Sequence, residues 1–284
     1  MLGSLDAAGV MVQGNAREIV AGSAWILLPG VVVGLVATSL AFDRYQSLKG
    51  AAVSVPELLG GEQAATGLEE LLWYAGLVIS SLAACLVGGF VSTLVVQRRT
   101  EQPLRVAAAY RALVPRLPAL ALAWLLGHAW FPLAILFLDN VAGTARAALA
   151  VLASPLILVA VTYTLVAAPA IVIEGLGPVG GLRRSWGLAR NHFGMLFGFV
   201  VASVLIGLLV QYGIAYLPRL LQATGLISFG HFGWLIEGAA GQLGRLISTP
   251  LVATATALVY LEVRMAAEGM DIAVEADQAF GPAR

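Results

Sequence analysis

The chain has 284 residues, of which 60% are hydrophobic and only 11% are charged. Soluble domains usually have roughly 25% charged residues, so this composition excludes a globular protein with a polar surface and predicts a protein that is solvated by lipid. The sixteen acidic and sixteen basic side chains cancel, which argues against a nucleic-acid partner. Cys85 is the single cysteine, so an intrachain disulfide and a cysteine-based metal site are excluded.

Six apolar stretches have the length of about 20 residues that a helix needs to cross the hydrocarbon core. They cover approximately residues 21–42, 71–96, 117–138, 148–173, 194–216 and 243–261. The third contains His128 and two prolines, and the sixth is the shortest and most polar. No basic leader with a small-residue cleavage site precedes the first stretch, so we expect it to be retained as a span. Residues 43–70 and 217–242 are expected to be external loops.

A faint repeat runs along the chain, because a short amphipathic segment precedes each odd-numbered span. The sequence therefore predicts one all-α membrane domain of three units, each a surface helix followed by a transmembrane hairpin. The units cover about residues 1–96, 103–173 and 178–264, with a short tail at 265–284. Pairs of glycines four residues apart, such as Gly30 and Gly34, permit close helix packing either within the monomer or between copies.

The distribution of basic residues predicts the orientation, since basic residues favour the cytoplasmic side. With both termini inside, eleven basic residues are cytoplasmic and five are external. The cytoplasmic set is Arg17, Arg98, Arg99, Arg105, Arg111, Arg116, Arg183, Arg184, Arg190, Arg264 and Arg284, and the external set is Arg44, Lys49, Arg146, Arg219 and Arg245. We therefore expect a multi-pass protein of the bacterial inner membrane with cytoplasmic termini.

The third amphipathic segment, residues 179–192, combines an apolar stripe with arginines. Its stripe consists of Val179, Leu182, Trp186, Ala189 and Phe193, and Arg183, Arg184 and Arg190 lie off it. Such a helix is typical of a membrane surface, where arginines set topology and contact lipid phosphates. Acids at the inner ends of spans are costly unless they are paired. We therefore predict a network that clasps this helix to the bundle and offers a candidate headgroup site, formed by Glu174, Arg183, Arg184, Trp186, Arg190, Tyr260, Glu262 and Arg264.

Catalytic and metal-binding motifs are weak. Residues 175–181, GLGPVGG, lack the lysine and hydroxyl residue of a phosphate loop, so we interpret them as a hinge. His128, His192 and His231 have no metal-ligand spacing, so we expect no metal or cofactor, and we interpret His128 as a satisfied or interfacial histidine. The middle thirds of the spans lack the acids that are typical of ion-coupled transporters.

Three motifs are similar to a known family. APAIVIEG at 168–175, GLRRSWGLARNHF at 181–193 and ALVYLEVRMAAEGMDI at 257–272 resemble the membrane domain of the glycerophosphoryl diester phosphodiesterase superfamily, in its stand-alone, mostly actinobacterial form. In the third motif the family pattern falls on Tyr260, Glu262, Arg264, Glu268 and Gly269, and a second arginine that the family often has is replaced by Met265–Ala267. The resemblance implies the fold but no phosphodiesterase activity, because the catalytic barrel is absent.

These observations favour a non-enzymatic membrane module that organises lipid or a membrane protein partner, with envelope lipid handling as one setting. Homo-oligomerisation stays open. An alternative is a transporter or channel for a small or amphiphilic solute, which predicts a continuous polar path through the bundle. A membrane-embedded enzyme is a third alternative, which predicts acids of the external loops converging in one pocket.

Overall fold

The protein is a bundle of helices that cross a membrane. The computed structural model describes residues 2–40, 67–139, 141, 143–225 and 227–269, and within these ranges every regular element is helical. Six stretches are long and apolar enough to cross a membrane: Arg17–Ala37, Tyr74–Arg99, Val106–Leu138, Ala148–Ile173, Phe193–Ala223 and Gly233–Glu268. The prediction of an all-α, multi-pass membrane protein is confirmed. Most of the expected first external loop and of the tail lies outside the described residues.

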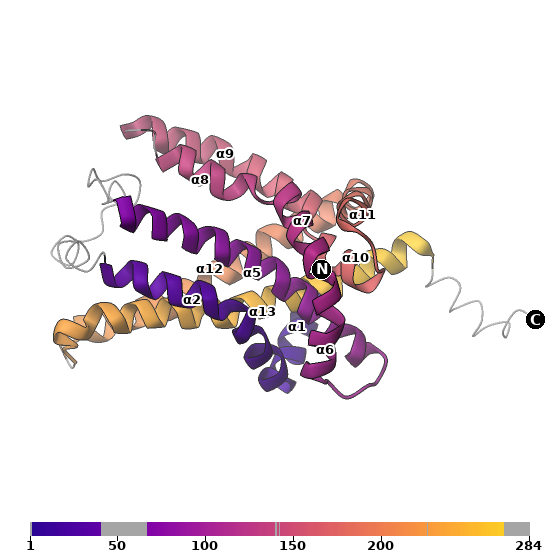
Figure 1. The fold of residues 1–284 in the computed structure, drawn as a ribbon, viewed down its shortest axis with the longest axis horizontal. Coiled ribbons are helices and arrows are strands. Elements are labelled where there is room, and N and C mark those ends of the chain that lie inside the picture. The colour runs from indigo at the N-terminus through magenta and orange to yellow at the C-terminus, as the bar shows by residue number, and fades with distance from the viewer. Residues whose placement is uncertain (1, 41–66, 140, 142, 226, 270–284) are drawn as a thin grey trace, which may run out of the picture.

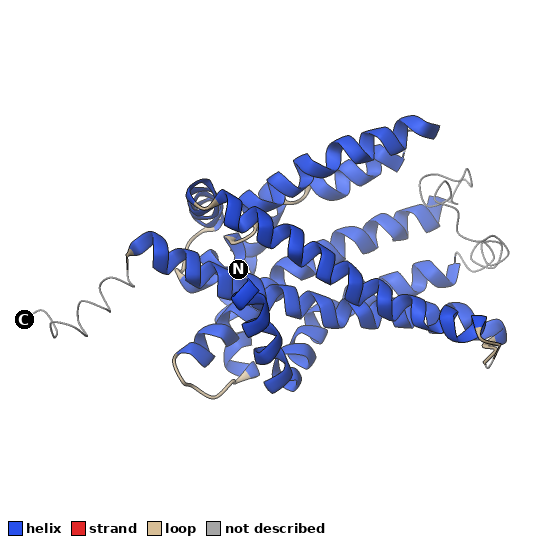
Figure 2. Ribbon diagram, turned by 180° about the vertical axis from the view of Figure 1, so that it is seen from behind, coloured by secondary structure: helices blue, strands red, loops and turns tan. Residues whose placement is uncertain are grey.

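Figures 1 and 2 show the order and arrangement of the helices. They are α1 (Leu2–Gly14), a π-helical turn (Arg17–Ala21), α2 (Gly22–Leu40), α5 (Gly67–Arg99), α6 (Val106–Leu113), a 3-10 turn (Val114–Arg116), α7 (Leu117–Gly127), α8 (Trp130–Asp139), α9 (Gly143–Thr164), α10 (Ala167–Ile173), α11 (Pro178–Asn191), α12 (Phe193–Ala223), a second 3-10 turn (Gly230–Phe232) and α13 (Gly233–Glu268).

Helix α13 is the most buried of the six spans, and it is longer than the expected sixth span. It packs against α1, α2, α5 and α12, and 61% of its span is buried although its mean hydropathy of 1.6 is the lowest of the six. The sequence predicts a short span at 243–261 because polar residues reduce the hydropathy of the flanking turns. Those residues are buried against other helices: Glu237, Ser248, Thr254 and Thr256 are all less than 9% exposed. The expected external loop at 217–242 is consequently shorter, since α12 extends to Ala223 and α13 begins at Gly233.

An ion pair joins α12 and α13 at the end of the bundle away from α11. Arg219 Nε lies 3.0 Å from Glu237 Oε2, and the guanidinium also lies 5.4 Å from the centre of the Tyr216 ring. Gln222 Nε2 donates to Glu237 Oε1 at 3.4 Å. The carboxylate is buried, so these partners compensate for its lost hydration.

Spans three and four are each interrupted about two thirds of the way along their length. Residues 128–129 separate α7 from α8, and residues 165–166 separate α9 from α10. Pro132 and Pro169 follow these links. Proline cannot donate to the carbonyl four residues earlier, and its ring clashes with that carbonyl. The carbonyls concerned belong to His128 and Leu165, so the two prolines account for the positions of both interruptions.

Helices α1, α6 and α11 lie at one end of the bundle (Figure 1). Tyr110 of α6 is anchored there, because its hydroxyl donates to the Gly22 carbonyl at 2.6 Å and its ring lies 4.8 Å from that of Phe90. The glycine pair in α2 packs within the chain: a Cβ at Gly30 would lie 2.8 Å from Ser80 Oγ, and one at Gly34 would lie 2.7 Å from Gln242 Nε2. These two glycines therefore allow α5 and α13 to approach α2.

Candidate functional site: a charged cluster that fastens helix α11

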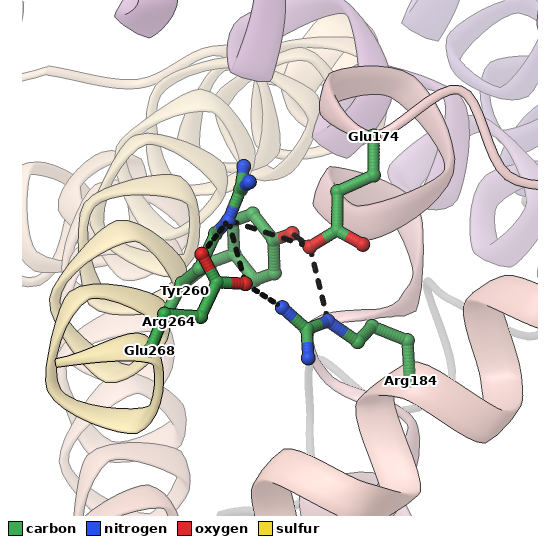
Figure 3. A network of polar contacts seen from close by, with 5 residues as sticks. All are labelled: Glu174, Arg184, Tyr260, Arg264 and Glu268. Atoms are coloured by element: carbon green, nitrogen blue, oxygen red, sulfur yellow. Dashed lines mark hydrogen bonds and ion pairs between the residues drawn. The ribbon is translucent and has the colours of Figure 1, made fainter. Parts of the chain in front are cut away.

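Five polar side chains from three helices meet at the end of the bundle that carries α11 (Figure 3). Glu174 follows the last turn of α10, and Arg184 lies on α11. Tyr260, Arg264 and Glu268 are four residues apart on α13, so they share one face of that helix. We call these five residues the clasp.

The contacts within the clasp are direct. Arg184 Nε donates to Glu174 Oε1 at 3.0 Å, and its Nη2 donates to Glu268 Oε1. Arg264 Nε lies 3.6 Å from Glu174 Oε1 and donates to the two carboxylate oxygens of Glu268 at 3.1 and 3.2 Å. The Tyr260 hydroxyl donates to Glu174 Oε1. Each guanidinium therefore contacts both carboxylates.

Two positive and two negative charges balance within the clasp. Glu174 retains 15% of its side-chain exposure, while Arg184, Arg264 and Glu268 retain 28–31%. Burial alone would lower the pKa of Arg184, but the hydrogen bond and charge of Glu174, the hydrogen bond of Glu268 and the charge of Tyr260 together outweigh burial and raise the pKa above its ordinary value. Arg184 consequently stays charged. The arrangement holds helices together and has no surplus charge with which to attract a further anion.

The chain brings Glu174 to this position through a sharp turn. Glu174 caps α10, and Gly175 follows with a φ of +71°, the left-handed conformation that glycine adopts without strain at a helix end. Arg116 Nη1 donates to the Gly175 carbonyl at 3.1 Å, which ties this turn to the start of α7. The predicted hinge at 175–181 is therefore a left-handed turn followed by the first turn of α11.

Helix α11 is also fastened by packing along a buried face. Gly181, Ser185, Leu188 and Ala189 are buried, and a side chain at Gly181 would collide with Ile171 of α10. The Ser185 hydroxyl donates to the Tyr163 carbonyl at 2.8 Å. This face shares Ala189 with the predicted stripe, but Val179 and Trp186 of that stripe are 56% and 57% exposed. The difference arises because α10 approaches α11 at Gly181, where no side chain intervenes.

The structure divides the predicted site residues into two groups. Glu174, Arg184, Tyr260 and Arg264 meet in the clasp, whereas Arg183 and Arg190 are exposed on α11. Trp186 stacks on Tyr163 with ring centres 4.2 Å apart. Glu262 lies two positions after Tyr260 and therefore points roughly 200° around the helix from it.

Glu268 completes the clasp and is missing from the predicted network, although it lies in the motif at 257–272. Its signal is the spacing Tyr260, Arg264, Glu268, which places all three on the face that receives Glu174. Among the described residues, no three His, Cys, Asp or Glu side chains are placed to hold a metal ion.

Comparison with known proteins gives a family but no activity. No curated protein and no solved structure matches the chain. Residues 112–265 match the model of a family described as Domain of unknown function (DUF7847), and this match covers Glu174, Arg184, Tyr260 and Arg264. The match does not test the resemblance to the phosphodiesterase membrane domain, which stays a prediction. Since the match spans more than half of the 284 residues, the chain belongs to the DUF7847 family.

Proposed function

We propose that the protein is a non-enzymatic membrane module that organises anionic lipid at one membrane surface, with α11 as the lipid-contacting element. The observation that carries the proposal is that the arginines of α11 have two different environments. The carboxylates of the clasp pair with Arg184 and fix the helix, while Arg183 and Arg190 remain exposed beside the exposed Trp186. Arginine binds phosphate oxygens through its planar fork, and tryptophan favours the membrane interface.

The proposed orientation places α1, α6 and α11 on the cytoplasmic face of a bacterial inner membrane. In this arrangement each short helix precedes a transmembrane hairpin, as the repeat in the sequence predicts. The excess of arginine among the segments that link the spans at this end supports the orientation. Anionic lipids of that leaflet attract basic side chains.

Replacing Arg183 and Arg190 together by glutamine is expected to weaken retention of phosphatidylglycerol. Each basic residue near an anionic surface contributes about 1 kcal/mol, so two residues correspond to roughly a 30-fold loss of affinity. Native mass spectrometry of protein from nanodiscs containing phosphatidylglycerol and phosphatidylcholine would count the lipids retained. The clasp is unaltered in this variant, so folding should be preserved.

The matched control replaces Arg98 and Arg99, two exposed arginines at the end of α5, by glutamine. This variant loses the same charge from another helix. A selective loss of phosphatidylglycerol in the α11 variant supports the proposal. Equal losses in both variants, or no loss in either, would show that α11 has no particular role in binding lipid.

A further inference from the structure

A small pocket, open to the surface, lies where the first span begins. It has a volume of about 230 Å³ and is lined by Arg17, Glu18, Ala21, Gly22, Trp25 and Val106. The first three of these residues belong to the π-helical turn, a rare conformation that is frequent at functional sites. None of the lining residues belongs to the clasp or to α11, so this pocket is separate from the site described above.

The floor of the pocket is held in place by neighbouring helices. The hydroxyl of Tyr110 on α6 donates to the Gly22 carbonyl at 2.6 Å. A Cβ at Gly22 would lie 2.6 Å from Cζ of Phe90 on α5, so the start of α2 is packed closely against that ring. Ile19, in the π-helical turn, is fully buried. The walls of the pocket therefore keep their positions without a ligand.

Two opposite charges border the pocket without being paired. Arg17 is exposed and Glu18 is partly exposed, and neither side chain has a hydrogen-bond or ion-pair partner among the described residues. Neighbouring residues on a helix do not face each other, which explains why the two do not pair with one another. In the clasp, by contrast, each guanidinium contacts both carboxylates. The pocket thus offers both a cation and an anion to an external partner.

The position of the pocket places it at the level of lipid headgroups. The first span extends from Arg17 to Ala37, so the pocket lies at the end of an apolar helix and not in its middle. Trp25 lines the pocket and is 73% exposed, and exposed tryptophan favours the boundary between headgroups and hydrocarbon. A lipid is consequently the molecule with the readiest access to this pocket.

The charges of the pocket favour a headgroup that carries both signs. A simple anion would be attracted by Arg17 and repelled by Glu18, and a simple cation would experience the reverse. A phosphate accepts hydrogen bonds from the planar guanidinium of arginine, and a primary ammonium group has three N–H donors for a carboxylate. The trimethylammonium group of phosphatidylcholine has no N–H donor, so it cannot replace the primary ammonium group at Glu18.

We propose that this pocket binds the headgroup of phosphatidylethanolamine, with the phosphate at Arg17 and the ammonium group at Glu18. The glycerol and the acyl chains extend past Trp25 into the bilayer. The inference goes beyond the proposed role of α11, because it assigns a second lipid class to different residues on a different helix.

Carbodiimide coupling of the full chain tests the proposal in nanodiscs of phosphatidylethanolamine and phosphatidylcholine. The reagent joins a carboxylate to a primary amine as an amide, so it captures phosphatidylethanolamine that contacts an acid, and phosphatidylcholine does not react. Mass spectrometry of peptides identifies the coupled acid. Asp6 and Glu101 are exposed acids outside the pocket and serve as controls within the same chain. Coupling to soluble ethanolamine corrects for differences in reactivity among the three acids.

We expect the corrected adduct at Glu18 to exceed that at Asp6 or Glu101 about fivefold. This ratio corresponds to about 1 kcal/mol, the upper value for an exposed ion pair. Arg17→Gln should lower the adduct at Glu18 by a similar factor, because the phosphate loses its partner. Arg190→Gln, the same change at an exposed arginine of α11, should leave the adduct unchanged. Ala21 lines the pocket and is exposed, so Ala21→Phe should fill the pocket and remove the adduct.

Three results would overturn the proposal. The first is an equal corrected adduct at Glu18, Asp6 and Glu101 in the unaltered chain, a comparison that requires no variant. The second is an unchanged adduct at Glu18 in Arg17→Gln. The third is equal coupling of Glu18 to soluble glycerophosphoethanolamine, which would show that the pocket binds a soluble zwitterion and not a lipid. Retention of phosphatidylglycerol by the α11 variants is measured separately, so a failure of either proposal is recognisable by itself.

Discussion

Replacing Glu174 by alanine is expected to lower the free energy of unfolding by about 2 kcal/mol, because two guanidinium groups and a buried hydroxyl lose their common partner. Removing one partner of a fully buried ion pair costs about 3–5 kcal/mol, and the partial exposure of Arg184 and Arg264 reduces this figure through solvent screening. For a chain of this size the loss corresponds to a decrease in Tm of roughly 4–8 °C. Thermal unfolding in a mild detergent, followed by tryptophan fluorescence, would measure it.

Two further variants and their combination separate the effect of charge from that of hydrogen bonding. Glu174→Gln keeps an oxygen acceptor for Tyr260 and Arg184 but removes the negative charge, so we expect a smaller loss than with alanine. Tyr260→Phe removes one hydrogen bond, worth about 1 kcal/mol. In a double-mutant cycle, the Glu174 and Tyr260 changes should be less than additive because the side chains share a contact.

Arg190→Gln is the matched control, because Arg190 is an exposed arginine on the same helix as Arg184. Exposed substitutions usually change stability by less than about 0.5 kcal/mol. If Arg190→Gln destabilised the protein as much as Glu174→Ala, the clasp would not be the main attachment of α11.

The clasp shows what the sequence can reveal about a polar site in a membrane protein. Glu174 at the end of an apolar span and the arginines after it indicate a pairing, because an acid at that depth is costly when it is alone. The pattern cannot tell Arg183 from Arg184, since adjacent residues on a helix differ by only about 100°. The close packing of α10 on Gly181 decides the rotation of α11, and this depends on tertiary contact.

The lengths and interruptions of the spans could be predicted from the sequence only in part. Mean hydropathy identifies six spans, but every polar residue lowers it, whether that residue faces water or another helix. The predicted sixth span is therefore shorter than α13, whose polar residues face other helices. The interruptions at 128–129 and 165–166 have a sequence signal in Pro132 and Pro169. That signal is ambiguous, because Pro155, Pro218 and Pro250 lie inside continuous helices. Only the packing around each proline determines whether the helix breaks.

The second large effect is expected at Gly244, where α13 crosses α12. A Cβ on this residue would lie 2.7 Å from the carbonyl oxygen of Gln211 and 2.8 Å from its Cα. These are backbone atoms of a long helix, so no rotamer change can relieve the clash and the two helices must separate. Overpacking of this kind costs about 1–3 kcal/mol, which exceeds the gain in helix propensity of about 1 kcal/mol from glycine to alanine.

Gly244→Ala is therefore expected to destabilise the protein, and Gly244→Val should do so more strongly. Gly213→Ala is the matched control: it makes the same chemical change on α12, at a position where a Cβ would meet nothing within 4 Å.

Helix propensity alone predicts that both alanine variants stabilise the protein. Close packing at Gly244 predicts that the free energy of unfolding changes with opposite signs in the two variants. Thermal unfolding of the two variants in the same detergent separates the explanations, and stabilisation by both would show that α12 and α13 are not held together at Gly244. Opposite signs would instead identify Gly244 as the contact that sets the distance between α12 and α13, whose far end carries the clasp residues Tyr260, Arg264 and Glu268.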